Sequence, residues 1–219
     1  MARNFDIPFG ESKLSALWDA TDEARAVVVL AHGSGAGKEH PFLEGFAQAL
    51  SPLGINVLRF NFPYMDAGKK FPDRAPVAVS VWNTVYDWTQ QNLADTLPVF
   101  VAGKSFGGRM GSMMVAEGRD VPGLIFLGYP LHSPKTPEKL RTEHLYDITA
   151  PMLFLQGTKD PFAQVPLLQD ILAQLGTRAS VEMIEGGDHS FKTARSGRSV
   201  LQDGAQLATP VHAFIDGLI

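Results

Sequence analysis

Short runs rich in β-branched residues, Leu and Phe alternate along this chain with longer amphipathic stretches. Such alternation is typical of helices packed on a mostly parallel sheet, because a parallel strand needs a long crossover before the next strand begins. We therefore expect an α/β fold with a mostly parallel central sheet and helices on both faces. The runs predict strands at Ala26–Ala31, Asn56–Phe60, Val99–Gly103, Gly123–Leu127, Met152–Gln156 and Ser180–Ile184. The amphipathic stretches predict helices at Pro41–Ser51, Pro76–Leu93, Phe106–Glu117, Val165–Leu175 and Val200–Leu218.

The first residues predict a different element, an N-terminal antiparallel hairpin. Phe5–Phe9 and Leu14–Trp18 are separated by Gly10-Glu11-Ser12-Lys13, a short connection that contains glycine. Further along, apolar residues of the second predicted helix recur at helical spacing and predict one buried stripe: Val77, Val81, Val85 and Trp88.

Composition limits the class of protein. The chain has 219 residues, which suits one domain, and no repeat or linker divides residues 1–219. The net charge of −4 argues against nucleic-acid binding, because no basic stripe is available to displace counterions from phosphates. The absence of cysteine excludes disulfides, thiolate nucleophiles and cysteine zinc sites.

The sequence carries no signal for export or for a membrane. Met1–Gly10 lacks the long apolar core of a signal peptide. Val27–Ala31, the most apolar early run, is far too short to span a bilayer. We therefore expect a cytoplasmic protein without membrane attachment, and the sequence leaves its oligomeric state open.

The clearest chemical motif is Gly103-Lys104-Ser105-Phe106-Gly107, a G-x-S-x-G pattern between a predicted strand and a predicted helix. In this setting a serine lies on a tight turn that lifts its hydroxyl out of the sheet, an arrangement called a nucleophile elbow. The alternative is that Ser105 only caps the following helix. The strand–turn–helix setting favours the nucleophile.

Two further candidates, Asp160 and His189, lie just past the ends of predicted strands, where open α/β sheets place their ligand sites. A serine hydroxyl needs a base to remove its proton, and the base works best when a third group fixes its tautomer. Ser105, His189 and Asp160 therefore form a candidate catalytic triad. The alternatives are Asp160 as a turn former and His189 as a surface histidine. Asp188 is a competing acid, but adjacent side chains rarely orient each other as a triad requires.

The oxyanion of a tetrahedral intermediate needs two backbone N–H donors. We expect one from Phe106, after the candidate nucleophile, and the other from Ser34 in the loop His32-Gly33-Ser34-Gly35-Ala36-Gly37. His32 itself is expected to be a structural hydrogen-bonding residue. A nucleotide-binding function for this loop fails, because neither a Walker A nor a Rossmann pattern has its required residues at His32, Lys38 and Glu39.

Several residues near the predicted site have two readings. Lys104 suggests a serine–lysine mechanism, but a residue just before an elbow serine points elsewhere and is expected to support the fold. Arg109 could bind an acidic substrate group, although a structural salt bridge is the simpler expectation. Four aromatic residues either form an apolar substrate pocket or are simply packed: Phe62, Tyr64, Phe162 and Phe191.

Taken together, these motifs resemble the α/β-hydrolase superfamily, in particular its small, lidless, dienelactone-hydrolase-like branch. The resemblance spans nearly the whole chain and is carried by three runs: Gly103–Arg109, Gln156–Phe162 and Gly186–Phe191. It implies that Ser105, Asp160 and His189 are nucleophile, acid and base, in the chain order of that superfamily. Dienelactone hydrolases use a cysteine nucleophile, and this departure argues against lactone substrates. The segment Gly128–Pro151, where many members insert a lid, is too short for a large cap domain.

The resulting hypothesis is a serine hydrolase, free of metal and cofactor, that acts on small carboxylic esters or thioesters through an acyl-enzyme. Two alternatives stay open. One is a non-catalytic scaffold or binding protein, since the group of similar proteins includes apparent scaffolds and a fold does not define a function. The other is the same triad acting on peptide or amide bonds.

Overall fold

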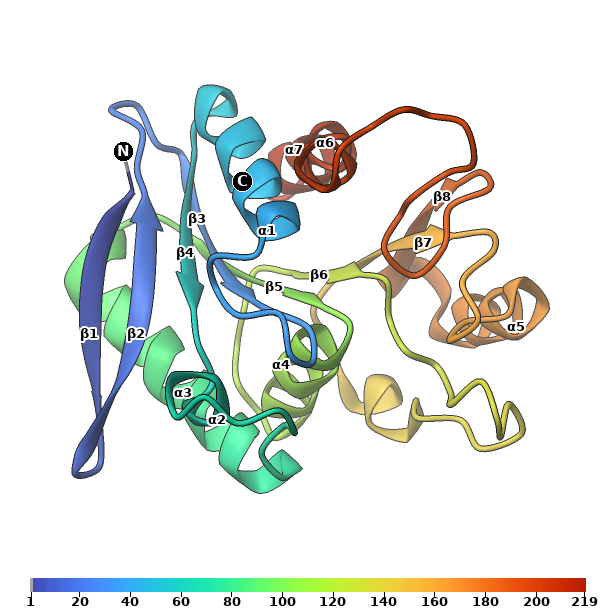
Figure 1. Cartoon of the computed structure of the whole chain (residues 1–219), viewed down its shortest axis with the longest axis horizontal. Coiled ribbons are helices and arrows are strands. Elements are labelled where there is room, and N and C mark those ends of the chain that lie inside the picture. Colours follow the sequence, from blue (N-terminus) through green and yellow to red (C-terminus); the bar gives the residue numbers. More distant parts are fainter. Residues whose placement is uncertain (1) are drawn as a thin grey trace.

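The computed structural model describes residues 2–219 and contains one eight-stranded sheet in the order β1-β2-β4-β3-β5-β6-β7-β8 (Figure 1). β1 and β2 form the N-terminal hairpin, and β2 pairs antiparallel with β4. All other neighbours are parallel. The strands are β1 Arg3–Phe9, β2 Ser12–Asp19, β3 Ala26–Ala31, β4 Ile55–Phe60, β5 Val99–Lys104, β6 Leu124–Leu127, β7 Met152–Gly157 and β8 Ala179–Ile184.

Helices cover both faces of the sheet (Figure 1). Residues of α3, α4 and α5 join one buried cluster, and residues of α1 and α7 join the other. The α-helices are α1 Pro41–Leu50, α2 Pro63–Asp66, α3 Ala75–Thr89, α4 Phe106–Ala116, α5 Val165–Leu175, α6 Val200–Ala205 and α7 Ala208–Asp216. Single-turn elements are η1 Ser51–Leu53, η3 Glu143–Asp147 and η4 Gly176–Arg178, with a π-helical turn, η2, at Gln90–Ala94.

β3 shows why the sheet is covered on both faces. All six of its residues are buried, and alternate residues join different clusters. Val27, Val29 and Ala31 lie on the side of α3 and α4, while Ala26, Val28 and Leu30 lie on the side of α1. In a strand, successive side chains point to opposite faces of the sheet. A strand that is apolar at every position is therefore buried on both faces.

The chain runs outward in opposite directions from β3, which lies between β4 and β5. The loops that follow β3 and β5 therefore separate at the carboxyl edge of the sheet and leave a crevice between them, the usual ligand site of an open α/β sheet. The register pairs Ala31 at the end of β3 with Gly103 near the end of β5. The loop after β3 and the turn at Ser105 thus begin at nearly the same level.

The predicted strands and the predicted fold class are confirmed, and most element ends agree within a residue. The predicted helix Val200–Leu218 is two helices, α6 and α7. The break has a simple cause: Pro210 has no N–H to donate to a carbonyl of the preceding turn, so it is accommodated in the first turn of a new helix. The hairpin turn is shorter than expected, because Ser12 and Lys13 already pair within the hairpin.

The predicted buried stripe of α3 is correct in part. Val81 and Val85 are fully buried, and the half-buried Trp88 packs against Phe5 with ring centroids 5.3 Å apart. Val77 is 41% exposed, because the first turn of α3 places Ala78 rather than its neighbour on the inner face.

No part of the described chain, residues 2–219, forms a lid over the sheet. Between β6 and β7 the chain forms turns and the short 3₁₀ helix η3, as expected for a segment too short for a large cap domain. Within residues 2–219 none of the helices combines the length and apolarity needed to cross a membrane.

α1 and α6 cross at two glycines. A Cβ atom built on Gly45 of α1 would lie 1.9 Å from the carbonyl oxygen of Leu201, and one on Gly204 of α6 would lie 1.9 Å from that of Phe42. The helix backbones are therefore in direct contact. This crossing fixes the position of Phe42, whose ring also lines the cavity described below.

Gly45→Ala is expected to lower the free energy of unfolding by about 2–3 kcal/mol, because overpacked backbone contacts must be forced apart. Urea unfolding measures this change. Gly217→Ala is the matched control, since Gly217 has a helical φ of −74° and its Cβ would meet nothing closer than 3.6 Å. The control should stay within about 0.5 kcal/mol of the original protein. Equal stability of the two variants would contradict the proposed crossing.

Candidate active site

A cavity of about 520 Å³ opens at the carboxyl edge of the sheet, between the loop after β3 and the turn after β5. This size is usual for a small-molecule site. Its wall is made by Gly33, Ser34, Ala36, His40, Phe42, Leu43, Lys104, Ser105, Phe106, Arg109, Pro130, Arg141, Phe162, His189, Ser190 and Val200.

Ser105 lies in a sharp turn between β5 and α4. Its backbone has φ 49° and ψ −113°, a conformation that a residue with a side chain rarely adopts. Glycines on both sides permit it: a Cβ on Gly103 would lie 2.2 Å from the amide nitrogen of Gly108, and one on Gly107 would lie 2.5 Å from the carbonyl oxygen of His32. The turn therefore brings α4 directly against the ends of β5 and β3, with the Ser105 hydroxyl at the cavity wall.

Three side chains from distant parts of the sequence meet beside this turn. The Nε2 atom of His189 lies 2.8 Å from the Ser105 Oγ atom, and its Nδ1 atom lies 2.6 Å from Oδ2 of Asp160. A neutral imidazole with its proton on Nδ1 makes both hydrogen bonds: Nδ1–H donates to the carboxylate, and the serine hydroxyl donates to Nε2.

The carboxylate of Asp160 is held from several sides. Only 1% of its side chain is exposed. Besides His189, it accepts hydrogen bonds from the Gln156 side-chain amide and from the backbone amide of Phe162, the latter at 2.8 Å. Asp188, the competing acid, instead accepts the backbone amides of Ser190 and Lys192 and stabilises the turn that carries His189. The structure thus pairs the imidazole with Asp160.

Lys104 holds the loop that carries His189. Its ammonium group donates a 2.5 Å hydrogen bond to the His189 carbonyl oxygen and lies 5.5 Å from the centre of the Phe191 ring. Burial lowers the pKa of Lys104 to about 8. The interaction that the structure shows for Lys104 is thus with the histidine loop, as expected for a supporting residue.

The pKa of His189 is lowered, first by burial and then by the positive charge of Lys104, while the hydrogen bond to Asp160 opposes the shift. The imidazole is therefore neutral at neutral pH. In that form Nε2 can accept a proton from the Ser105 hydroxyl.

The loop after β3 brings its backbone to the same cavity. Ser34 and Phe106 both line the wall, and their amide nitrogens donate no hydrogen bond to any group of residues 2–219. The Phe106 amide is free because it begins α4, where the first N–H groups have no partner in the helix. These two amides are therefore available to a ligand oxygen.

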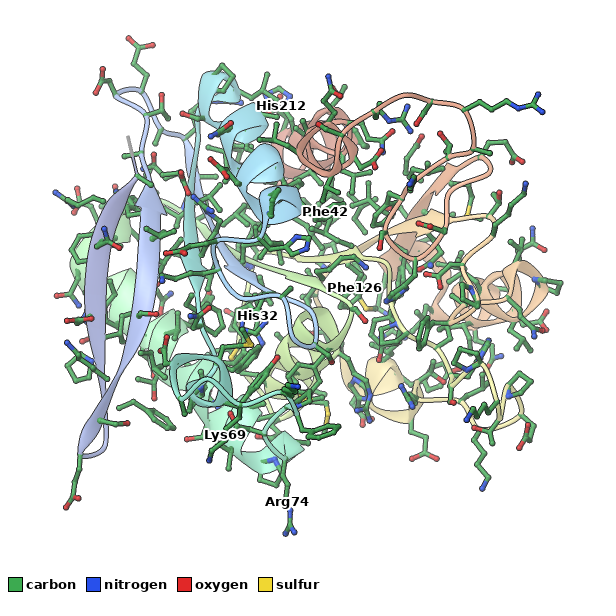
Figure 2. All side chains as sticks on the ribbon, in the orientation of Figure 1. His32, Phe42, Lys69, Arg74, Phe126 and His212 are labelled. Carbon is green, nitrogen blue, oxygen red and sulfur yellow. The ribbon has the colours of Figure 1, made fainter. Side chains whose placement is uncertain are left out.

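His32 holds this loop, as expected for a structural residue. It is fully buried; Nδ1 donates to the Gly33 carbonyl oxygen at 2.7 Å, and Nε2 accepts from the Phe62 amide at 3.2 Å. The hydroxyl of Tyr64 accepts from the Gly35 amide at 2.9 Å. Figure 2 shows His32 near the centre of the molecule.

The four predicted pocket aromatics separate into two groups. Phe162 lines the cavity and packs on the His189 ring, with centroids 4.4 Å apart. Phe62, Tyr64 and Phe191 are buried and lie outside the wall. They pack behind it, because the His32 loop and the helix α1 need an apolar support, and they are not placed to touch a ligand in the cavity.

Sequence analysis missed a second serine–histidine pair. The Oγ atom of Ser112 lies 2.8 Å from Nε2 of His144, and its hydroxyl donates to the Arg109 carbonyl oxygen at 2.8 Å. No motif surrounds either residue, so only the fold brings them together. Ser112 is fully buried and outside the cavity wall. Of the two pairs, Ser105–His189 is the one in which a carboxylate hydrogen-bonds the histidine and the serine lies at the cavity wall.

Arg109 makes no salt bridge with any carboxylate of residues 2–219, so the expectation of a structural ion pair is wrong. Its Nε atom is buried and has no hydrogen-bond partner. Arg141, which carried no sequence signal, lies in the same cavity wall. No cluster of three or more His, Asp or Glu side chains suited to a metal ion occurs within the described residues.

Comparison with known proteins agrees with the observed fold. Residues 24–216 match the family described as the alpha/beta hydrolase domain, so the chain belongs to that family. Similar solved structures include Est1E from Butyrivibrio proteoclasticus, with 18% identity, a TM-score of 0.78 and 98% of each chain covered. The dienelactone hydrolase of Anabaena variabilis has 22% identity and a TM-score of 0.77, with 100% of this chain and 98% of the other covered.

A third similar structure is XC6422 from Xanthomonas campestris, described as an α/β serine hydrolase without a lid. It has 21% identity and a TM-score of 0.72, and 94% of each chain is covered. At this level of identity these structures show a shared fold. That fold, without a lid, agrees with the fold predicted from the sequence.

Burial lowers the pKa of both His32 and His144 to about 4. Between about pH 6.5 and pH 4 the unfolded chain therefore binds protons that the folded protein does not, so the stability conferred by neutral burial falls as the pH falls through this window. Two-dimensional NMR should show both rings neutral at pH 5, with His32 protonated on Nδ1. Urea unfolding should have a lower midpoint at pH 5 than at pH 7.5. A titration of His32 near 6.5 would contradict its burial.

Proposed function

We propose that this protein is a serine hydrolase that cleaves small carboxylic esters or thioesters. The observation that carries the proposal is the continuous hydrogen-bonded chain Asp160–His189–Ser105, which ends in a hydroxyl at a cavity wall next to two unused backbone amides. The strained turn at Ser105 supports it, because an unfavourable backbone conformation at a cavity is common at catalytic residues.

In the proposed mechanism the Ser105 Oγ atom attacks the acyl carbonyl carbon while its proton moves to Nε2 of His189. The resulting imidazolium is stabilised by the carboxylate of Asp160. The carbonyl oxygen becomes an oxyanion, and the amides of Phe106 and Ser34 donate hydrogen bonds to it. Collapse of the intermediate breaks the bond to the alcohol or thiol, which leaves with the proton of His189.

The remaining acyl group is bonded to Ser105 and is removed by water. His189 takes a proton from the water, the hydroxide attacks the acyl carbon, and the second tetrahedral intermediate releases the carboxylic acid as the proton returns to Ser105. The absence of a lid over the cavity is consistent with small substrates that enter directly from solvent.

Ser105→Ala is expected to abolish covalent labelling by an alkyl fluorophosphonate and to lower kcat for 4-nitrophenyl butyrate by about 10⁴-fold or more, because the nucleophile is removed. Mass spectrometry of the labelled protein and a colorimetric assay measure the two effects. Ser112→Ala is the matched control: the Ser112 hydroxyl also contacts a histidine, but it is buried outside the cavity, so this variant should still be labelled. Unchanged turnover in Ser105→Ala would refute the mechanism. An unlabelled original protein without ester turnover would favour a scaffold role.

The acid limb of kcat/KM against pH is expected to have its midpoint below 6.5, because the pKa of His189 is lowered. Lys104→Met should move this midpoint upward, since the positive charge of Lys104 disfavours the imidazolium, whereas Asp160 and Asp188 favour it. Rates of 4-nitrophenyl butyrate hydrolysis between pH 4.5 and 9 measure both midpoints. Lys69→Met, an exposed lysine at the edge of the molecule in Figure 2, should leave the midpoint unchanged. A downward shift in Lys104→Met would contradict this electrostatic role.

A further inference from the structure

The cavity wall contains a cation that the proposed mechanism does not use. Arg109 lies one helical turn after Ser105, and its amide donates to the Ser105 carbonyl oxygen at 3.0 Å. No carboxylate of residues 2–219 forms a salt bridge with its guanidinium, its buried Nε is left without a partner, and the group beside it is the neutral Tyr129 hydroxyl. A guanidinium keeps its charge at any ordinary pH, and a partly buried charge without a counter-ion is costly. An orphaned group of this kind in a native protein calls for an explanation.

Arg141 brings a second positive charge to the same place. It lies in the cavity wall and forms no salt bridge with a described residue. The Tyr129 hydroxyl donates to the Arg141 carbonyl oxygen at 2.8 Å, which fixes the segment that carries it. Burial raises the pKa of Tyr129, whereas the charges of Arg109 and Arg141 both lower it. One hydroxyl thus lies within the electrostatic reach of both guanidinium groups.

The charges around the cavity have one sign. None of the described residues in its wall is an aspartate or a glutamate, and the carboxylate of Asp160 lies behind the His189 ring. The ammonium group of Lys104 is already bonded to the His189 carbonyl oxygen. Burial lowers the pKa of both His40 and His189, which favours their neutral forms. Arg109 and Arg141 are therefore the cations left free to receive a ligand.

The position of Arg109 also limits how far the ligand's charge lies from the reacting carbonyl. Four residues of α-helix correspond to a rise of about 6 Å, and Arg109 and Ser105 both line the cavity, so they are neighbours on its wall. A ligand whose anionic group binds Arg109 while Ser105 attacks its ester carbonyl would have only a short chain between those two groups. The cavity of about 520 Å³ has room for such a ligand.

We propose that Arg109 and Arg141 form an anion subsite, and that the preferred substrate is a short ester or thioester that carries a carboxylate. The inference rests on the proposed function and adds the substrate class to it. A planar guanidinium binds a carboxylate through two parallel hydrogen bonds, which supplies orientation as well as charge neutralisation. The subsite therefore selects substrates by charge and places the ester carbonyl at Ser105.

Two matched pairs of esters test the proposal. Mono-4-nitrophenyl glutarate and 4-nitrophenyl pentanoate differ by a carboxylate on the acyl part. 4-Acetoxybenzoate and 4-acetylphenyl acetate differ by a carboxylate on the alcohol part. The protein is expected to show at least tenfold higher kcat/KM for the charged ester of one pair, which also tells which part of the substrate occupies the subsite. Arg109→Gln and Arg141→Gln should each reduce that preference about tenfold or more, and Arg109→Lys should retain part of it. Arg74→Gln, an exposed arginine at the periphery in Figure 2, should leave the preference unchanged.

Absence of a charge preference in both pairs, or a preference that neither arginine variant reduces, would overturn the subsite while leaving the hydrolase intact. A binding measurement keeps the two proposals separate. Glutarate should raise the unfolding temperature of the original protein and of Ser105→Ala, but not that of Arg109→Gln, and neutral glutaramide should raise none of them. Failure of all ester turnover together with retained glutarate stabilisation would reject the hydrolase and support the subsite. No stabilisation by glutarate in any variant would count against the subsite.

Discussion

The carboxyl ends of parallel strands lie along one edge of a sheet, and the candidate active site depends on this constraint. Ser105 follows β5, Asp160 follows β7 and His189 follows β8, so three side chains far apart in the sequence leave the sheet in the same direction. The His32 loop joins them because β3 pairs with β5 in register. The two hydrophobic clusters that hold the strands between helices therefore also hold the site together.

The turn at Ser105 places one hydroxyl of this arrangement at the cavity wall. A residue with a side chain at φ 49° and ψ −113° costs about 1–3 kcal/mol, and such a cost persists only where the surroundings enforce it. Here the enforcement comes from packing: the buried Met110 and Met114 fix α4, while Gly103 and Gly107 let its first turn touch β5 and the end of β3. A larger residue at either glycine would separate the helix from the sheet and move the Ser105 hydroxyl away from His189. Stability of the core and placement of the hydroxyl are thus coupled.

Much of the fold could be predicted from the sequence because its signals are local. Ala26–Ala31 is apolar at every position, which indicates a strand buried on both faces, and the G-x-S-x-G motif marks the turn that follows β5. The break between α6 and α7 was missed because the apolar period continues across it, although Pro210 offered a signal. The order of the strands in the sheet has no local signal, since it depends on which pairing buries the most apolar surface.

The candidate site, like the fold, has features with a local sequence signal and features without one. The placement of Ser105, Asp160 and His189 beside one another follows from strand ends, which sequence analysis can estimate. Which aromatic rings face the cavity depends on side-chain packing, and for this reason Phe62 and Phe191 could not be separated from Phe162. The pairing of Ser112 with His144 and the position of Arg141 depend on the irregular chain between β6 and β7, whose path has no periodic pattern.

Positive charges beside the active site link the proposed mechanism to the proposed class of substrate. Lys104 anchors the His189 loop through a backbone carbonyl, and burial, with the charge of Lys104 as a smaller contribution, lowers the pKa of the imidazole so that it is neutral and can accept a proton. Burial and this charge together oppose the imidazolium that the proposed reaction must form, and the hydrogen bond to Asp160 offsets them only in part. Arg109 adds further positive charge to the cavity without a protein counter-ion. A bound carboxylate would neutralise this excess where the imidazolium develops, so an anionic substrate would help its own hydrolysis by improving the electrostatic environment of the base as well as by binding.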